Sequence, residues 1–195
     1  MSSAYVEYHV DDLSLKAFNK GECQWSNTND TYVAISVFSS ESGGSIKLVN
    51  KNGLVIDPED QSLASQIPIK PGARVCSYSW HPVTNTLAVG WENGDLGCYQ
   101  IGPVRNKWVY SQADEEYSTL GPLMHIHWLG SNGNELVTID ASGLLIIWTF
   151  DQISAVLSSR ASHQVNDEIT DAVPATIDGD PGLYMSSAGG NRNNK

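Results

Sequence analysis

The feature that most constrains the fold is an order of residues that occurs three times along the chain. Each occurrence starts at a tryptophan, continues through a polar stretch and reaches a short apolar run. Trp25, Trp80 and Trp128 are 55 and 48 residues apart, close to the ~40–50-residue period of propeller-type repeats. The apolar runs begin seven, seven and eight residues after the tryptophans, at Tyr32, Leu87 and Leu136.

A glycine-bearing turn and a second apolar run follow in all three units. The three glycines, each with a bulky residue five positions beyond it, form the pairs Gly44 and Val49, Gly94 and Tyr99, and Gly143 and Trp148. Runs rich in Val, Ile, Leu and Tyr that are bounded by Asn, Asp, Ser and Gly are typical of strands and turns. Glycine supplies the positive φ that tight hairpin turns require. The sequence therefore predicts tandem antiparallel hairpins.

The second unit gives the most detailed prediction. We expect a strand from Val75 to Trp80 and then a turn at His81 and Pro82, because proline cannot continue a strand ladder. The strand should return over residues 87–91, and a turn at Gly94 should follow. In the third unit, residues 144–148 are apolar without alternation, which indicates a strand covered on both faces.

These patterns predict an all-β chain built as a partial, unclosed WD40-type β-propeller of about three blades. We expect the blades over residues 5–60, 61–110 and 111–152, and a mostly disordered tail over residues 153–195, which is rich in Ser, Asn, Asp, Gly and Pro. Closed propellers have ~4–8 blades, so three units would leave blade faces uncovered. We therefore expect the chain to be a fragment.

Composition narrows the range of partners and compartments. A formal net charge of −11, without a basic cluster, argues against nucleic acid as a partner. Three cysteines without a C-x-x-C spacing fit neither a disulfide framework nor a zinc ribbon. The acidic N-terminus does not fit a signal peptide, and no run approaches the ~20 apolar residues of a membrane span. We expect a cytoplasmic protein.

The order Trp-x-Pro, polar turn, apolar run, glycine turn and apolar run resembles the WD repeat family of β-propellers. Trp80 and Pro82 carry the first part of this resemblance, and Asp140, Gly143 and Trp148 carry the last part in the third unit. The Gly-His pair of the family is missing, and Thr149 stands where aspartate would complete the Trp-Asp dipeptide. The resemblance implies that Trp25, Gly44, Trp80, Pro82, Gly94, Trp128, Asp140, Gly143 and Trp148 are structural repeat positions.

A narrower resemblance is to the first blades of the intraflagellar transport protein 140 family, strongest over residues 75–100. It implies a non-catalytic scaffold in ciliary transport complex A, with other complex A subunits and ciliary cargo as partners. The implied roles are retrograde transport and cilium assembly, and the implied location is the cilium, its axoneme or its basal body. Two alternatives stay open, namely an adaptor of another cytosolic assembly, such as a vesicle coat or ubiquitin ligase, and the propeller domain of an enzyme.

Few residues suggest chemistry, and we expect no catalytic residue, cofactor site or metal site. His81 beside Trp80 could act as a general base, but turn chemistry explains it more simply. The imidazoles of His125 and His127 should lie on one side of a strand, a spacing that metal sites use, yet no further ligands are evident. The acidic run at residues 114–116 is typical of a solvated loop, and phosphate-binding glycine motifs are missing.

Overall fold

The computed structural model describes residues 23–25, 32–50, 67, 69–100, 121–151 and 156–187. Every regular element in these ranges is a β-strand, which confirms the all-β prediction. The strands are β1 (Cys23–Trp25), β2 (Tyr32–Ser39), β3 (Gly43–Asn50), β4 (Val75–Trp80), β5 (Thr86–Trp91), β6 (Leu96–Gln100), β7 (Leu123–Leu129), β8 (Glu135–Asp140), β9 (Leu144–Asp151), β10 (Val156–Gln164), β11 (Ile169–Ile177) and β12 (Asp180–Ser187).

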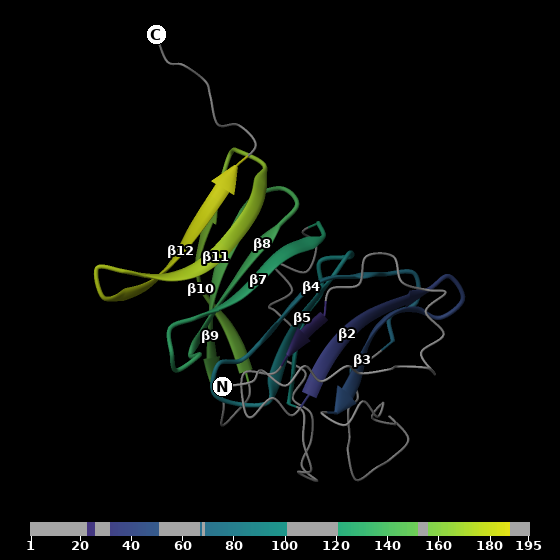
Figure 1. Cartoon of the computed structure of the whole chain (residues 1–195). Coiled ribbons are helices and arrows are strands. Elements are labelled where there is room, and N and C mark those ends of the chain that lie inside the picture. The colour runs from purple at the N-terminus through teal and green to yellow at the C-terminus, as the bar shows by residue number, and fades with distance from the viewer. Residues whose placement is uncertain are drawn as a thin grey trace, which may run out of the picture.

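The strands form four separate sheets that follow the chain in order. Their strand orders are β1-β2-β3, β4-β5-β6, β7-β8-β9-β10 and β11-β12, and we name them sheets A, B, C and D. Within each sheet, strands that follow one another in the sequence pair antiparallel. Figure 1 shows the sheets following one another from β2 and β3 on the right to β11 and β12 at the upper left. This serial arrangement of small antiparallel sheets is that of propeller blades.

Neighbouring sheets contact each other mainly through their first strands. Strand β4 lies against β1 and β7, and β7 lies against β11. Side chains also donate hydrogen bonds from one sheet to the backbone of the one before. The Tyr78 hydroxyl donates to the Ala34 carbonyl at 3.3 Å, and the Trp128 indole Nε1 donates to the Ser79 carbonyl at 3.0 Å. The first strands therefore form the common centre around which the sheets are arranged.

The recurring sequence order corresponds to one recurring row of residues across each sheet. In each sheet the tryptophan of the first strand pairs with an apolar residue of the second, which pairs with the bulky residue five positions beyond the glycine. The rows are Trp25, Val33 and Val49 in sheet A, Trp80, Leu87 and Tyr99 in sheet B, and Trp128, Leu136 and Trp148 in sheet C. The sheets are thus built on the same register.

Three apolar clusters fill the spaces between successive sheets. The first joins sheets A and B around Leu48 and Trp91, and the second joins sheets B and C around Ile126 and Trp148. The third joins sheet C to sheet D around Ile139 and Ala172. Strand β9 contributes to the second cluster with one face and to the third with the other. The prediction that residues 144–148 are covered on both faces is therefore confirmed.

The β5–β6 turn tests the role of glycine in these hairpins. Gly94 has a φ of 86°, and its amide donates to the Trp91 carbonyl at 3.0 Å. Replacing Gly94 with valine should lower the free energy of unfolding by at least ~1–2 kcal/mol, because a side chain in this left-handed region meets the backbone. Thermal melting measures the effect, and Gly94→Asn is the control because asparagine tolerates positive φ. An unchanged melting temperature for Gly94→Val would contradict the turn geometry.

The prediction of a mostly disordered tail after residue 152 is wrong for residues 156–187. Strand β10 pairs with β9 along its length as the fourth strand of sheet C, and β11 and β12 form the hairpin of sheet D. The polar composition of this segment gives little local signal for order. Its strands are instead stabilised by pairing with β9 and by the burial of Ala172 against sheet C.

Candidate functional site

The β8–β9 turn of sheet C is organised by the carboxylate of Asp140, which is almost fully buried. Asp140 Oδ1 accepts hydrogen bonds from the Ser142 amide at 2.8 Å, the Ser142 hydroxyl at 2.6 Å and the Leu144 amide at 2.9 Å. The Gly143 amide donates to the Asp140 carbonyl at 3.0 Å, with a φ of 82° at Gly143. Aspartate commonly stabilises turns by accepting backbone amides two residues further on. Asp140 therefore closes the β8–β9 hairpin.

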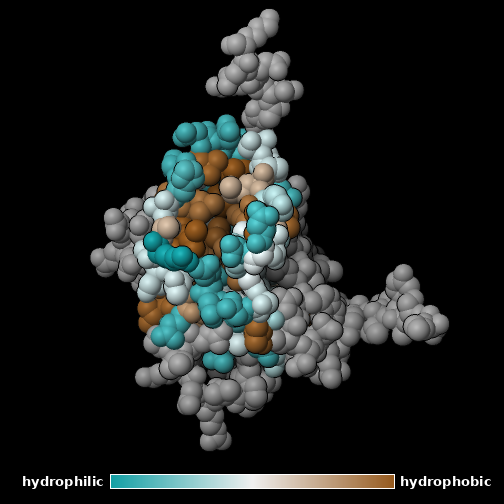
Figure 2. Space-filling model, turned by 90° about the vertical axis from the view of Figure 1, so that its left-hand side faces the viewer, coloured by the Kyte–Doolittle hydropathy of each residue, from teal (hydrophilic) through white to brown (hydrophobic). Residues whose placement is uncertain are grey.

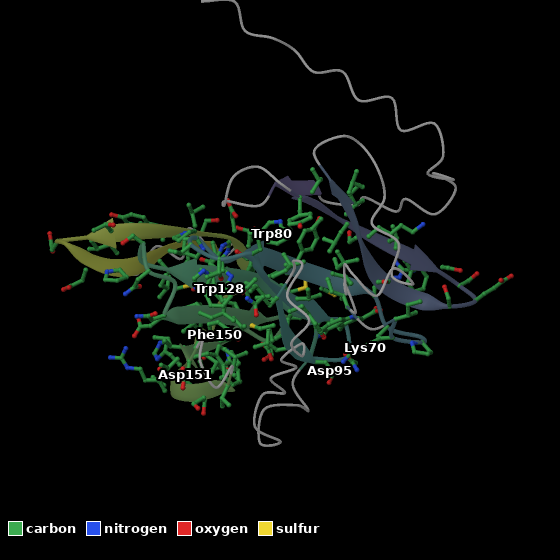
Figure 3. The ribbon with its side chains drawn as sticks, turned by 90° about the horizontal axis from the view of Figure 1, so that it is seen from below. Lys70, Trp80, Asp95, Trp128, Phe150 and Asp151 are labelled. Carbon is green, nitrogen blue, oxygen red and sulfur yellow. The ribbon has the colours of Figure 1, made fainter. Side chains whose placement is uncertain are left out.

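Trp148, on β9 of sheet C, lies in the apolar cluster between sheets B and C. Its side chain is 2% exposed, and its indole Nε1 donates to the Thr138 hydroxyl at 2.9 Å. Buried indole N–H groups usually have such a partner. Figure 3 shows Trp80, Trp128 and Phe150 in the middle of the molecule, each on a different strand. These three aromatic side chains are at most 7% exposed and fill the spaces between the sheets.

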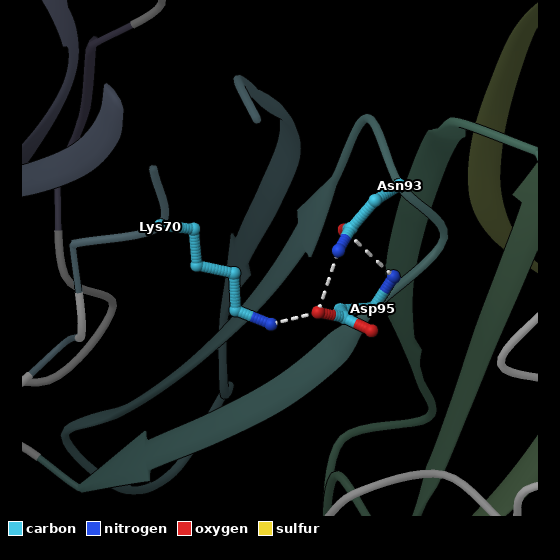
Figure 4. Close-up of polar contacts among 3 residues, drawn as sticks. All are labelled: Lys70, Asn93 and Asp95. Atoms are coloured by element: carbon cyan, nitrogen blue, oxygen red, sulfur yellow. Dashed lines mark hydrogen bonds and ion pairs between the residues drawn. The ribbon is translucent and has the colours of Figure 1, made fainter. Parts of the chain in front are cut away.

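The β5–β6 turn of sheet B carries a different polar group, Asp95, directly after its glycine (Figure 4). Asn93 Nδ2 donates to Asp95 Oδ2 at 2.8 Å, and Lys70 Nζ forms an ion pair with the same oxygen. The ammonium of Lys70 also lies 4.4 Å from the centroid of a ring of Trp91. Lys70 in turn forms a β-bridge with Gly44 of sheet A. One lysine therefore connects the β2–β3 hairpin to the β5–β6 turn.

The pKa of Asp95 reflects two opposing effects. Burial raises the pKa of the carboxyl. Hydrogen bonds from Lys70 and Asn93, together with the positive charge of Lys70, lower it by more, so that the pKa lies below its ordinary value of 3.8. The carboxyl is therefore charged at neutral pH and suited to holding Lys70. The arrangement fixes two sheets relative to each other, and a charged, hydrogen-bonded aspartate of this kind has no proton to donate.

His81 leaves the end of β4 and inserts between sheets B and C. Its side chain is fully buried, and its ring centroid lies 4.7 Å from that of Trp128 in an edge-on contact. Its Nδ1 accepts hydrogen bonds from the amides of Val83 at 3.1 Å and Thr84 at 3.0 Å. A hydrogen bond also joins the ring to the backbone of Gly133 in the β7–β8 turn.

The close approach of His81 explains why the β7–β8 turn carries glycine. A Cβ added at Gly133 would lie 2.3 Å from Nε2 of His81, well inside van der Waals contact, and Gly133 has a φ of 68°. The ring is therefore held on both nitrogens by backbone of two adjacent sheets. This position supports the interpretation that His81 stabilises the turn and packs between the sheets. Its Nδ1 already accepts two backbone hydrogen bonds, and its ring is buried from solvent.

The buried imidazole makes stability depend on pH. Burial lowers the pKa of His81 below its ordinary value of 6.5, although the hydrogen bond to Gly133 acts in the opposite direction. Burial and the neighbouring His125 likewise lower the pKa of His127. Below pH 6.5 the unfolded chain binds protons that the folded chain resists, so acidification favours unfolding. Above pH 6.5 both states are neutral at these groups, and their contribution is fully present.

We expect the free energy of unfolding in urea to be lower at pH 5.5 than at pH 7.5, and His81→Asn to reduce that difference. The asparagine oxygen keeps an acceptor for the Val83 and Thr84 amides but does not titrate. Asp95 does not contribute in this range, because its pKa lies below 3.8. A His81→Asn variant with the full pH dependence of the wild type would contradict this assignment.

The two other histidines of interest lie on one face of β7, as predicted. The ring centroids of His125 and His127 are 6.4 Å apart and nearly parallel. Nε2 of His127 is buried without a hydrogen-bond partner. Within the described residues, no group of three or more His, Cys, Asp or Glu side chains is arranged to hold a metal ion. Both residues lie on β7, the strand of sheet C that contacts β11 of sheet D.

The remaining predicted positions lie in strands and connections of the sheets or outside the described residues. Trp25 pairs with Val33 through its backbone in sheet A. The expectation that Gly44 supplies the positive φ of its turn is wrong, because that conformation belongs to Gly43, with a φ of 93°, and Gly44 lies within β3. The Gly44 amide donates to the carbonyls of Lys70 at 3.2 Å and Ala73 at 2.8 Å. Pro82 follows His81 in the β4–β5 connection. The acidic run at residues 114–116 lies outside the described residues. Among the residues that the structure describes, no helix is long and apolar enough to cross a membrane.

Sequence reasoning missed the contacts that join one sheet to the next. Lys70 lies in a connecting segment without a repeat signal, and Gly133 lies in the polar stretch between Trp128 and the apolar run at Leu136. Phe150, which contacts Trp128 at a centroid distance of 5.3 Å, lies beyond the repeated pattern. A comparison of the three units position by position would have shown that His81 occurs in only one of them. That difference indicates a contact specific to one pair of sheets.

Comparison with known proteins agrees with this architecture. A family model described as the IFT140 first beta-propeller matches residues 3–181. The structure is similar to a Bacteroides thetaiotaomicron VPI-5482 auxiliary nutrient binding protein, with a TM-score of 0.56, 9% identity and coverage of 85% of this chain and 42% of that one. It is also similar to a chain of the mitotic checkpoint complex, with a TM-score of 0.52, 15% identity and coverage of 85% and 47%.

A third similar structure is the β-propeller domain of Myceliophteria thermophila Cps50 (Swd1), with a TM-score of 0.50 and 13% identity. That match covers 86% of this chain and 55% of the other. At such low identity these likenesses show the fold alone. The chain spans about half the length of the solved chains that it matches, as expected for a partial β-propeller.

Proposed function

Because the chain belongs to the family described as the IFT140 first beta-propeller, we propose that it acts in ciliary transport as part of a complex A subunit. The match over residues 3–181 is the observation that carries this proposal. In this role the chain contributes to retrograde transport and to cilium assembly, and it is located in the cytoplasm and the cilium. Its partners are other complex A subunits and ciliary cargo.

The described side chains support a scaffold that binds proteins and does not perform chemistry. The polar groups inside the molecule are used for structure, since Asp140 holds a turn, His81 joins two sheets and Lys70 joins two hairpins. We propose that the nine repeat positions predicted from the sequence serve to build the blades. Loops and uncovered sheet faces would then be the surfaces offered to partners.

Affinity purification from ciliated cells tests the proposal. The tagged full chain should enrich the other subunits of complex A relative to a tagged, unrelated β-propeller, and its fluorescence should concentrate at the ciliary base and along the axoneme. Recovery of the chain without complex A subunits, and without ciliary enrichment, would contradict the ciliary assignment.

The same experiment separates the two alternatives. An adaptor of a vesicle coat or ubiquitin ligase would share the fold but recover the components of that assembly. An enzyme would need a polar side chain that is both accessible and poised for reaction, whereas the strongest candidate, His81, is fully buried with Nδ1 bound by two backbone amides. Hydrolysis of model ester or amide substrates by the purified chain would favour the enzyme alternative.

A further inference from the structure

The face of sheet C that meets sheet D carries two imidazoles among apolar residues. His125 and His127 on β7 are the register partners of Ile139 and Val137 on β8. Register partners share one face of a sheet, and Val137 and Ile139 belong to the apolar cluster between sheets C and D. Strand β7 itself contacts β11 and β12. The two imidazoles therefore lie on the side of β7 that faces sheet D.

The opposite face of β7 carries apolar residues at the neighbouring positions. Ile126 and Trp128 are 1% and 5% exposed and pack in the cluster between sheets B and C. Apolar side chains do not titrate, whereas an imidazole gains a positive charge between neutral and mildly acidic pH. On this one strand, the face toward sheet B is therefore insensitive to pH, and the face toward sheet D is not.

The surroundings of His127 are poorly suited to a positive charge. Its ring is stacked on that of His125, with an interplanar angle of 20°, and its Nε2 is buried without a hydrogen-bond partner within the described residues. A protonated imidazole donates from both nitrogens, so a proton on His127 would lack an acceptor there. Figure 2 views the molecule from the side where β11 and β12 lie, and apolar residues are gathered on that side.

Asp171 on β11 is the carboxylate that acts on this pair from sheet D. Burial lowers the pKa of His127 below its ordinary value of 6.5, the neighbouring His125 lowers it further, and Asp171 acts in the opposite direction. Asp171 Oδ1 also accepts a hydrogen bond from the Ala172 amide at 2.9 Å. The closed contact thus resists a proton that the same imidazole would accept in water.

The strands that contact β7 carry six other titratable residues, and β5 carries none. They are Glu135 and Asp140 on β8, Cys76 and Tyr78 on β4, and Asp180 and Tyr184 on β12. Glu135 is ion-paired with Arg160, and Asp140 accepts hydrogen bonds within its own turn. Tyr78 donates to sheet A. The charges that shift the pKa of His127 are instead those of His125 and Asp171.

We propose that the His125–His127 pair makes the contact between sheets C and D sensitive to acid, so that protonation of the pair releases the β11–β12 hairpin from sheet C. Above pH 6.5 His127 is neutral in the closed and the opened contact, and the contact keeps its full stability. Below pH 6.5 the opened contact binds the proton first, so opening becomes more favourable. Opening exposes the apolar face of Val137 and Ile139. This property is independent of the proposed ciliary role.

Amide hydrogen exchange of the full chain tests the proposal. Protection factors, corrected for the intrinsic effect of pH on exchange, should fall in residues 169–187 by up to about tenfold between pH 7.5 and pH 5.5, the limit for one imidazole one pH unit below 6.5. His127→Gln keeps a polar side chain that does not titrate, so it should remove most of this fall. A wild type with constant protection, or a His127→Gln variant with the full fall, would overturn the proposal.

Two charge variants should change the pH dependence in opposite directions. His125→Gln removes a positive neighbour of His127 and should make the fall smaller. Asp171→Asn removes the carboxylate that favours the charged imidazole, yet keeps an oxygen for the Ala172 amide, and should make the fall larger. Residues that only pack would not give opposite signs, so changes of the same sign would contradict the assignment. Circular dichroism checks folding, and Asp171→Asn, at an exposed residue, remains informative if His127→Gln is unfolded.

Two histidines outside this contact are the controls. His81→Asn removes the buried imidazole between sheets B and C, and His163→Gln removes an exposed one on β10. Neither should change the fall in residues 169–187 if the hairpin opens by itself. If His81→Asn reduces the fall as much as His127→Gln does, the hairpin exchanges only when the whole chain unfolds, and the proposal is wrong. Enrichment of complex A subunits is measured separately, so either proposal can fail while the other stands.

Discussion

Replacing Trp148 with alanine is expected to lower the free energy of unfolding by ~3–5 kcal/mol, the range for large aromatic residues removed from a core. The indole is 2% exposed and packs in the cluster between sheets B and C. Its removal leaves a cavity and also leaves the Thr138 hydroxyl without its indole donor. Chemical unfolding monitored by circular dichroism gives the loss directly.

Two variants separate packing from hydrogen bonding at this site. Trp148→Phe keeps most of the apolar contact, so it should cost clearly less than alanine. Thr138→Val removes the acceptor but preserves the shape, and the unpaired indole N–H should cost ~1–3 kcal/mol. If Trp148→Ala melted like the wild type, Trp148 would not be a core residue between sheets B and C. The repeated row of aromatic and apolar residues would then not be what stabilises the sheets.

A chain ended after Gln164 is expected to self-associate. This truncation keeps sheets A, B and C but removes the β11–β12 hairpin. It uncovers the face on which Leu129, Val137 and Ile139 are now at most 6% exposed. Uncovered apolar faces of this kind promote association. Gel filtration and light scattering should show larger species whose proportion rises with concentration, whereas the full chain should show far less of them.

A charged substitution provides the control for the truncation. Placing lysine at Val137 in the truncated chain should reduce self-association, because the uncovered face would then carry a charge. A truncated chain that elutes as a sharp monomer with native circular dichroism would show that sheet D contributes little to covering sheet C.

The hairpins of the three repeated units followed from local residue patterns. The strand from Val75 to Trp80 has the predicted bounds, and the φ of 86° at Gly94 agrees with the predicted turn. These features depend on residues close together in the sequence, where alternation, turn formers and β-branched residues act directly. The match of each tryptophan to its apolar partner was likewise visible as a spacing of seven or eight residues.

The connections between sheets could not be derived in the same way. The contact of His81 with Gly133 joins residues more than fifty positions apart, and nothing near either residue indicates the other. Strands β10 to β12 were missed because their order depends on pairing with β9 and on burial against sheet C. Composition predicts whether a segment is ordered by itself. It gives no information about strands that become ordered by pairing with another part of the chain.

The arrangement of sheets in which each contacts mainly its neighbours has a mechanical consequence. The free energy of unfolding of such a linear stack is approximately the sum of the stabilities of the single sheets and of the contacts between neighbouring sheets. The molecule should therefore unfold sheet by sheet, starting from the terminal sheets. Under a pulling force, the terminal hairpin should detach first, at low load and without disturbing the interior units. Amide exchange should show the same gradient, fastest in the last hairpin and slowest in β5 and β8.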